Sequence, residues 1–94
     1  MTTQTATQRP ISVTGYWHET ADARLYELSE PFRDILKYVV VSSIPEGDGF
    51  PAETCAFGAD ETGESVTGPW AILSLPGEGH HSEILGHLGY EVAK

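Results

Sequence analysis

The run Leu36–Ile44 constrains the fold more than any other stretch, because its apolar residues are consecutive rather than spaced along one face. It holds three valines in a row between a tyrosine and an isoleucine. In a strand, Tyr38 and Val40 point to one side, and Val39 and Val41 to the other. Apolar side chains on both sides indicate a strand that is covered on both faces and lies centrally in its sheet.

A buried helical segment is the alternative interpretation of such a run. The β-branched content, the length of nine residues and the stop at Pro45 favour the strand. The sequence therefore predicts a sheet that is organised around Leu36–Ile44.

The neighbouring segments predict an antiparallel sheet. Residues 24–32 alternate in the manner of a strand that ends before Pro31, and a short turn at 33–35 makes a hairpin with the central strand the simplest connection. Residues Glu53–Ala59 and 69–75 are predicted as a third and a fourth strand. Together they indicate a sheet of about four strands.

One short helix is predicted near the C-terminus, over residues 80–88. Its apolar residues recur at helical spacing: Ile84, Leu85 and Leu88. Ser82 is the expected N-cap and Gly89 the expected C-cap, and residues 90–92 follow as a short terminal strand. The predicted fold is a small α+β domain with this helix packed on one face of the sheet.

The N-terminal part of the chain lacks this patterning. Residues 1–10 are rich in Thr and Gln without periodicity, and we expect them to be disordered. Residues 11–17 alternate weakly and are predicted as a short edge strand. The expected organisation is a polar extension over residues 1–23 and a single domain over residues 24–94.

The distribution of charge restricts the classes of partner. The formal net charge is −9, and residues 38–93 contain nine Asp and Glu but no Lys or Arg. These carboxylates have no basic neighbour in their own segment, so their field repels nucleic acid and anionic membranes. Three interpretations remain open: a solvated acidic surface, an acidic face for a basic partner, or adaptation to high salt.

The acidic residues are densest at the turn that follows Glu53–Ala59. Asp60, Glu61 and Glu64 are expected at the exposed tip of a hairpin, and Trp70 follows shortly after them. If the acidic face binds a partner, these four residues are the predicted contact surface. For Trp70 the competing interpretation is a residue of the core or its rim.

His80, Glu83 and His87 form the alternative site. In one continuous helix they share a face at i, i+3 and i+7, and two imidazoles with a carboxylate are suitable zinc ligands. A cap at Ser82, however, leaves His80 outside the helix. The sequence also lacks the His-Glu-x-x-His pattern and its reverse.

No residue is predicted to be catalytic and no cofactor is expected. Cys55 is the single cysteine, which excludes an internal disulfide, and its neighbours in sequence carry no cation that would activate the thiol. No Gly-x-Ser-x-Gly motif is present. The lone thiol and the absence of a signal-like N-terminus favour a cytoplasmic protein.

Several segments together resemble a known group of proteins. They are Tyr-Val-Val-Val-Ser at 38–42, Glu-Thr-Cys-Ala-Phe-Gly-Ala-Asp-Glu-Thr-Gly at 53–63, the stretch 70–77 and Leu-Gly-Tyr-Glu-Val at 88–92. The pattern, which covers about residues 25–92, is similar to small proteins of actinobacteria and their phages with no assigned activity. The resemblance implies a bacterial or phage cytoplasmic setting and transfers no catalytic residue.

The sequence thus predicts a small acidic interaction protein without enzymatic activity, which binds a basic surface of a protein partner. A narrower version is a phage-encoded modulator or inhibitor of a host protein. The alternative is a metal-dependent module or small enzyme centred on His80–His87.

Overall fold

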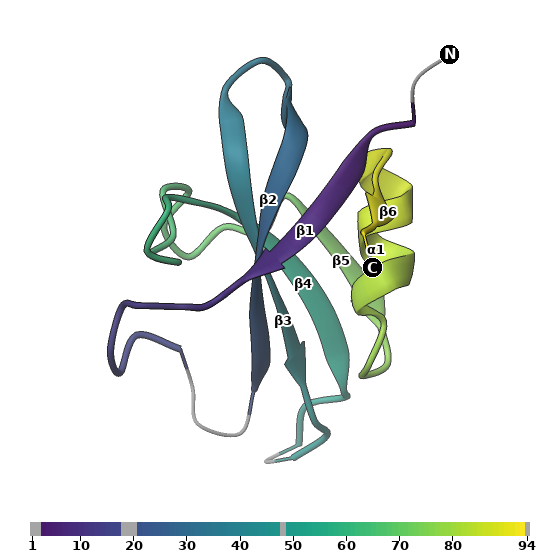
Figure 1. Cartoon of the computed structure of the whole chain (residues 1–94). Helices are drawn as coiled ribbons and strands as arrows, with labels where there is room; N and C mark the ends of the chain where they lie inside the picture. The colour runs from purple at the N-terminus through teal and green to yellow at the C-terminus, as the bar shows by residue number, and fades with distance from the viewer. Residues whose placement is uncertain (1–2, 18–20, 48, 94) are drawn as a thin grey trace.

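Leu36–Ile44 forms β3, the third strand from one edge of a single sheet (Figure 1). The computed structural model describes residues 3–17, 21–47 and 49–93. Its elements are β1 (Thr5–Arg9), β2 (Asp22–Phe32), β3, β4 (Glu53–Ala59), β5 (Leu73–Pro76), α1 (His81–Leu88) and β6 (Glu91–Val92).

Within the described residues the sheet has six strands in the order β5-β4-β3-β2-β1-β6 and curls into a half-barrel. Neighbouring strands are antiparallel except β1 and β6, which pair in parallel. The helix lies against one face of the sheet (Figure 1). The predicted α+β class with one short helix is confirmed, whereas the count of about four strands is wrong.

β3 is covered on both faces, as its sequence predicts. Val39, Val40 and Val41 are all fully buried. Val39 and Val41 belong to the core beneath α1, and Val40 packs with Leu25 and Ala59 on the opposite face. Consecutive apolar residues therefore serve two small cores, one on each side of the sheet.

The β2–β3 connection is the expected hairpin, and it is tight. Arg33 and Asp34 both have positive φ, at 53° and 62°, and the Ile35 N–H donates to the Phe32 carbonyl at 3.1 Å. Two central residues with positive φ make a turn whose twist matches that of the strands. β2 continues through Pro31, where the prediction ended it, because the register between Glu27 and Phe32 is irregular there.

The prediction of disorder over residues 1–10 is wrong for Thr5–Arg9. β1 lies between β2 and β6, where Ala6 is fully buried opposite Leu28 and Val92. Ala6 is the only buried residue of β1, so the sequence of this strand shows no alternation of apolar and polar residues. Backbone hydrogen bonds and the apolar residues of its neighbours hold the strand instead.

The face opposite α1 is covered by irregular chain. The backbone N–H groups of Ser12 and Val13 donate to the Thr62 carbonyl, at 2.9 and 3.1 Å. Ile11 lies against Gly63, whose φ of 96° suits glycine. The edge strand predicted at 11–17 is therefore wrong, because this segment bonds to the turn after β4 rather than to a strand.

α1 begins one residue later than predicted and ends as expected. Gly89 takes the left-handed conformation, with φ at 100°, and closes the helix C-terminus. The N-cap position is occupied by His80, whose side chain makes no capping hydrogen bond, so the expected cap at Ser82 is wrong.

β5 starts at Leu73, later than the predicted strand at 69–75. No helix among the described residues is long and apolar enough to cross a membrane.

Candidate functional site

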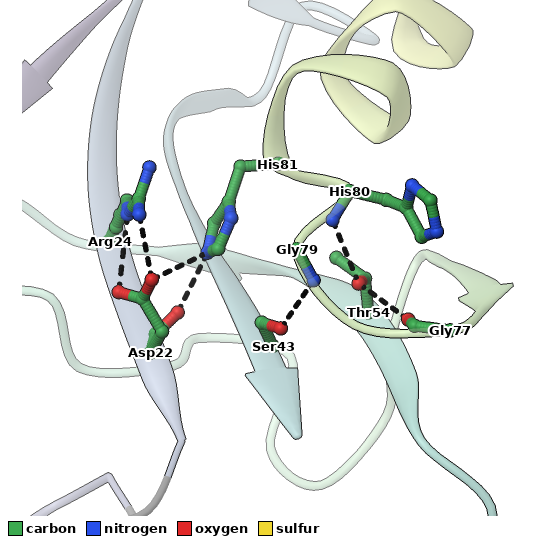
Figure 2. Close-up of polar contacts among 8 residues, drawn as sticks. All are labelled: Asp22, Arg24, Ser43, Thr54, Gly77, Gly79, His80 and His81. Carbon is green, nitrogen blue, oxygen red and sulfur yellow. Dashed lines mark hydrogen bonds and ion pairs between the residues drawn. The ribbon is translucent and has the colours of Figure 1, made fainter. Parts of the chain in front are cut away.

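The loop before α1 is fastened to the sheet by side chains of β3 and β4 (Figure 2). Ser43 Oγ accepts the Gly79 N–H at 2.7 Å, and Thr54 Oγ1 accepts the His80 N–H at 3.3 Å. Thr54 Oγ1 also donates to the Gly77 carbonyl at 2.9 Å. These two N–H groups are therefore engaged within the protein, and they do not point at an open site where an anion could bind.

His81 ties the start of the helix to β2. Its ring is buried, and Nε2–H donates to the Asp22 carbonyl oxygen at 2.7 Å. Arg24 forms an ion pair with Asp22 at 2.7 Å, and this hydrogen-bonded pair lowers the pKa of the carboxyl group. Figure 2 shows His81 directed toward Asp22, while the His80 ring points away from Asp22. Nothing in the sequence marks His81 rather than His80 as the buried histidine.

The alternative metal site is not assembled. The His80 Nδ1 atom contacts the carboxylate of Glu83, while His87 lies exposed in the last turn of α1. Within the parts of the chain that the structure describes, no three His, Cys, Asp or Glu side chains are grouped to hold a metal ion. The reason is local: His80 has φ −96° and ψ 39°, so its side chain does not follow the helical spacing that the alternative assumed.

Cys55 is a poor nucleophile. Its side chain is buried, its Sγ atom lies 3.5 Å from Ser74 Oγ, and burial raises the pKa of the thiol. A neutral buried thiol is unreactive because the thiolate is the attacking species. This agrees with the expectation that no neighbouring residue activates the thiol.

The three acidic residues of the turn after β4, which we call the acidic tip, have two different roles. The Asp60 carboxylate accepts hydrogen bonds from the Thr62 N–H at 2.9 Å, from Thr62 Oγ1 at 2.6 Å and from the Glu64 N–H at 3.2 Å. The hydrogen bond from the Thr62 hydroxyl is the main cause of its lowered pKa. Glu61 and Glu64 are exposed. Asp60 therefore shapes the turn, and the two glutamates are the side chains available for contact.

Trp70 lies on the surface, with 76% of its area exposed. The turn that carries it is held by Thr67, whose Oγ1 donates to the Trp70 carbonyl at 2.9 Å. Val66, in the same loop, is exposed as well. This loop and the acidic tip are successive parts of the β4–β5 connection, so the four predicted contact residues share one connection.

A groove that the sequence analysis missed lies at the end of β3 and the start of β4. Its volume is about 610 Å³. Its apolar lining includes Trp17, Ile44, Phe50 and Phe57, and its acidic lining comprises Glu46 and Glu53. The described lining residues include no lysine or arginine. The sequence feature that could have indicated this groove is Phe50, a large apolar residue within a loop of Pro, Gly and acidic residues.

Within the described residues, ion pairs that involve lysine or arginine are confined to β1 and β2. Arg9 pairs with Glu27 at 3.0 Å and Arg24 with Asp22 at 2.7 Å. Between residues 38 and 93, the described carboxylates form no ion pair with lysine or arginine. The charge asymmetry of the sequence is thus not neutralised by the described fold.

The chain matches no protein-family model, no curated protein and no solved structure. The resemblance to small proteins of actinobacteria and their phages therefore stays a prediction.

Proposed function

We propose that this chain is a small acidic interaction protein without enzymatic activity, which binds a basic surface of a protein partner in the cytoplasm. The observation that carries the proposal is the lack of ion pairs with lysine or arginine among the described carboxylates of residues 38–93. Glu61 and Glu64, exposed beside the turn that Asp60 closes, are the proposed electrostatic contact.

Unpaired surface carboxylates act mainly on association. A negative field steers a basic partner toward the surface and repels acidic competitors, and it changes the association rate more than the dissociation rate. Exposed Trp70 would add apolar contact area beside this field. In the setting that the sequence resemblance implies, the partner would be a host protein with a basic cleft, and the chain its modulator or inhibitor.

The test begins with capture of binding proteins from a bacterial lysate on the immobilised chain. Association rates of the purified partner are then compared for the parent, for the double variant Glu61→Gln/Glu64→Gln, and for the control Glu78→Gln/Glu91→Gln. Both variants remove two exposed carboxylates, but the control removes them from the segments before and after α1.

We expect slower association for the Glu61/Glu64 variant and a smaller change for the control, with equal melting temperatures. Association that is the same for the parent and both variants would contradict the proposal, as would a captured partner whose contact surface is acidic.

A further inference from the structure

One wall of the groove is held in place before any ligand binds. The Trp17 indole N–H donates to the Gly63 carbonyl at 2.8 Å, and its ring lies 5.3 Å from the Phe57 ring, tilted by 52°. Gly63 belongs to the turn that Asp60 closes, so this turn positions the indole. Aromatic surfaces that are already ordered lose little entropy on binding.

The other wall carries an aromatic side chain that the fold does not cover. Phe50 is 73% exposed. Gly47 and Phe50 exchange two backbone hydrogen bonds, of 2.8 and 3.1 Å, which close the loop and hold Phe50 at its end. Ile44 is also exposed beside the groove. Exposed apolar side chains gathered at a concave surface are characteristic of a contact site.

The charge of the groove selects its occupant. Glu46 and Glu53 line it, and the described lining residues include no cation. Ser74 Oγ donates to Glu53 Oε2 at 3.2 Å and so orients this carboxylate. Both carboxylates are exposed, so they would repel an anionic ligand and attract a cationic one. The lining therefore fits a cation with a flat or apolar body.

We propose that this groove binds an arginine side chain with an adjacent apolar residue, presented by an extended segment of the partner. This inference rests on the proposed function, which requires a basic partner. A guanidinium stacks on aromatic rings and forms paired hydrogen bonds to carboxylates, which the point charge of a lysine does less well. A volume of about 610 Å³ accommodates an arginine together with its neighbours.

The inference can be tested without the natural partner. The chain has two tryptophans, so Trp70→Phe leaves Trp17 as the only one and makes its fluorescence a signal of groove occupancy. The probes are blocked Leu-Arg-Leu, Leu-Lys-Leu and Leu-citrulline-Leu tripeptides, because citrulline keeps the shape of arginine without its charge. The protein variants, all in this background, are Glu46→Gln/Glu53→Gln and the control Glu78→Gln/Glu91→Gln, whose two exposed carboxylates do not line the groove.

We expect a saturable fluorescence change with the arginine peptide and binding weaker by about tenfold or more with citrulline, since a charge-assisted hydrogen bond is lost. Lysine should fall between the two. The Glu46/Glu53 variant should lose the preference for arginine over citrulline, and the Glu78/Glu91 control should keep it.

Equal binding of arginine and citrulline would overturn the inference, and so would the absence of saturation at millimolar peptide. Self-association of the chain that buries Trp17 would also overturn it, because a second copy would then occupy the groove. None of these results bears on the Glu61/Glu64 effect on partner association, so failure of the groove and failure of the proposed function can be told apart.

Discussion

Ala6→Asp tests the largest difference between the predicted and the observed fold. Ala6 is fully buried in β1 between Leu28 and Val92, so a carboxylate there has no access to water and no cationic partner in this core cluster. Keeping the group neutral at pH 7 requires its pKa to rise by about 3 units, which costs about 4 kcal/mol. The total stability of a domain is only about 5–15 kcal/mol.

We expect Ala6→Asp to lower the melting temperature by roughly 15 °C or more, or to leave the chain unfolded. Gln8→Asp is the matched control, because Gln8 lies two residues further along β1 and is exposed. The assay is thermal unfolding followed by near-ultraviolet circular dichroism. If the two variants melt within a few degrees of each other, β1 is not part of the core and the reasoning fails.

Three further predictions concern local packing and titration. Gly58→Ala should lower the free energy of unfolding in urea by about 1–3 kcal/mol, because the new Cβ atom would lie 2.8 Å from Leu36 Cδ2 and 2.9 Å from Thr67 Cγ2. Gly86→Ala, on α1 where the new Cβ atom meets open space, should raise the free energy of unfolding by up to about 1 kcal/mol. Equal effects of the two substitutions would contradict the packing around Gly58. Because the pKa of Asp60 is lowered in the folded chain, this carboxylate contributes stability that is fully present above pH 3.8, its ordinary pKa, and is lost as the pH falls through the folded-state pKa. Asp60→Asn should remove this part of the pH dependence of the melting temperature. An acid unfolding profile that is the same for the parent and the variant would refute the prediction. Cys55 should react with a thiol reagent much more slowly in the folded chain than in urea, because burial raises its pKa, and similar rates would place the thiol at the surface.

The elements that the sequence predicted well are those with apolar residues on both faces or at helical spacing. β3 and β4 have the predicted bounds, and α1 differs by one residue at its start. Their burial pattern is visible in the sequence because each strand contributes several buried side chains. β1 was not predicted because Ala6 is its only buried residue. Residues 11–17 were predicted as a strand from their weak alternation, whereas the N–H groups of Ser12 and Val13 bond to the Thr62 carbonyl in a turn that is distant in the sequence.

The candidate site was predictable only in part. The turn at Asp60 and the exposure of Glu61 and Glu64 follow from local sequence, since turn residues and charges report on their own position. The groove was not predictable, because Trp17 and Phe57 come together only after the sheet has formed. The spacing of histidines suggested a metal site that the backbone at His80 does not support.

The association rate of the captured partner as a function of salt shows whether the carboxylates of residues 38–93 mediate recognition. At about 0.15 M ionic strength the screening length is about 8 Å. The attraction between the described carboxylates, which form no ion pair with lysine or arginine, and a basic surface should therefore weaken steeply when the ionic strength is raised above this value. We expect the association rate to fall by roughly tenfold or more between about 0.05 M and 0.5 M salt, with a much smaller change in the dissociation rate. The salt dependence should be flatter for Glu61→Gln/Glu64→Gln. An association rate that does not change with salt would contradict recognition through these carboxylates and would leave their charge a matter of solubility.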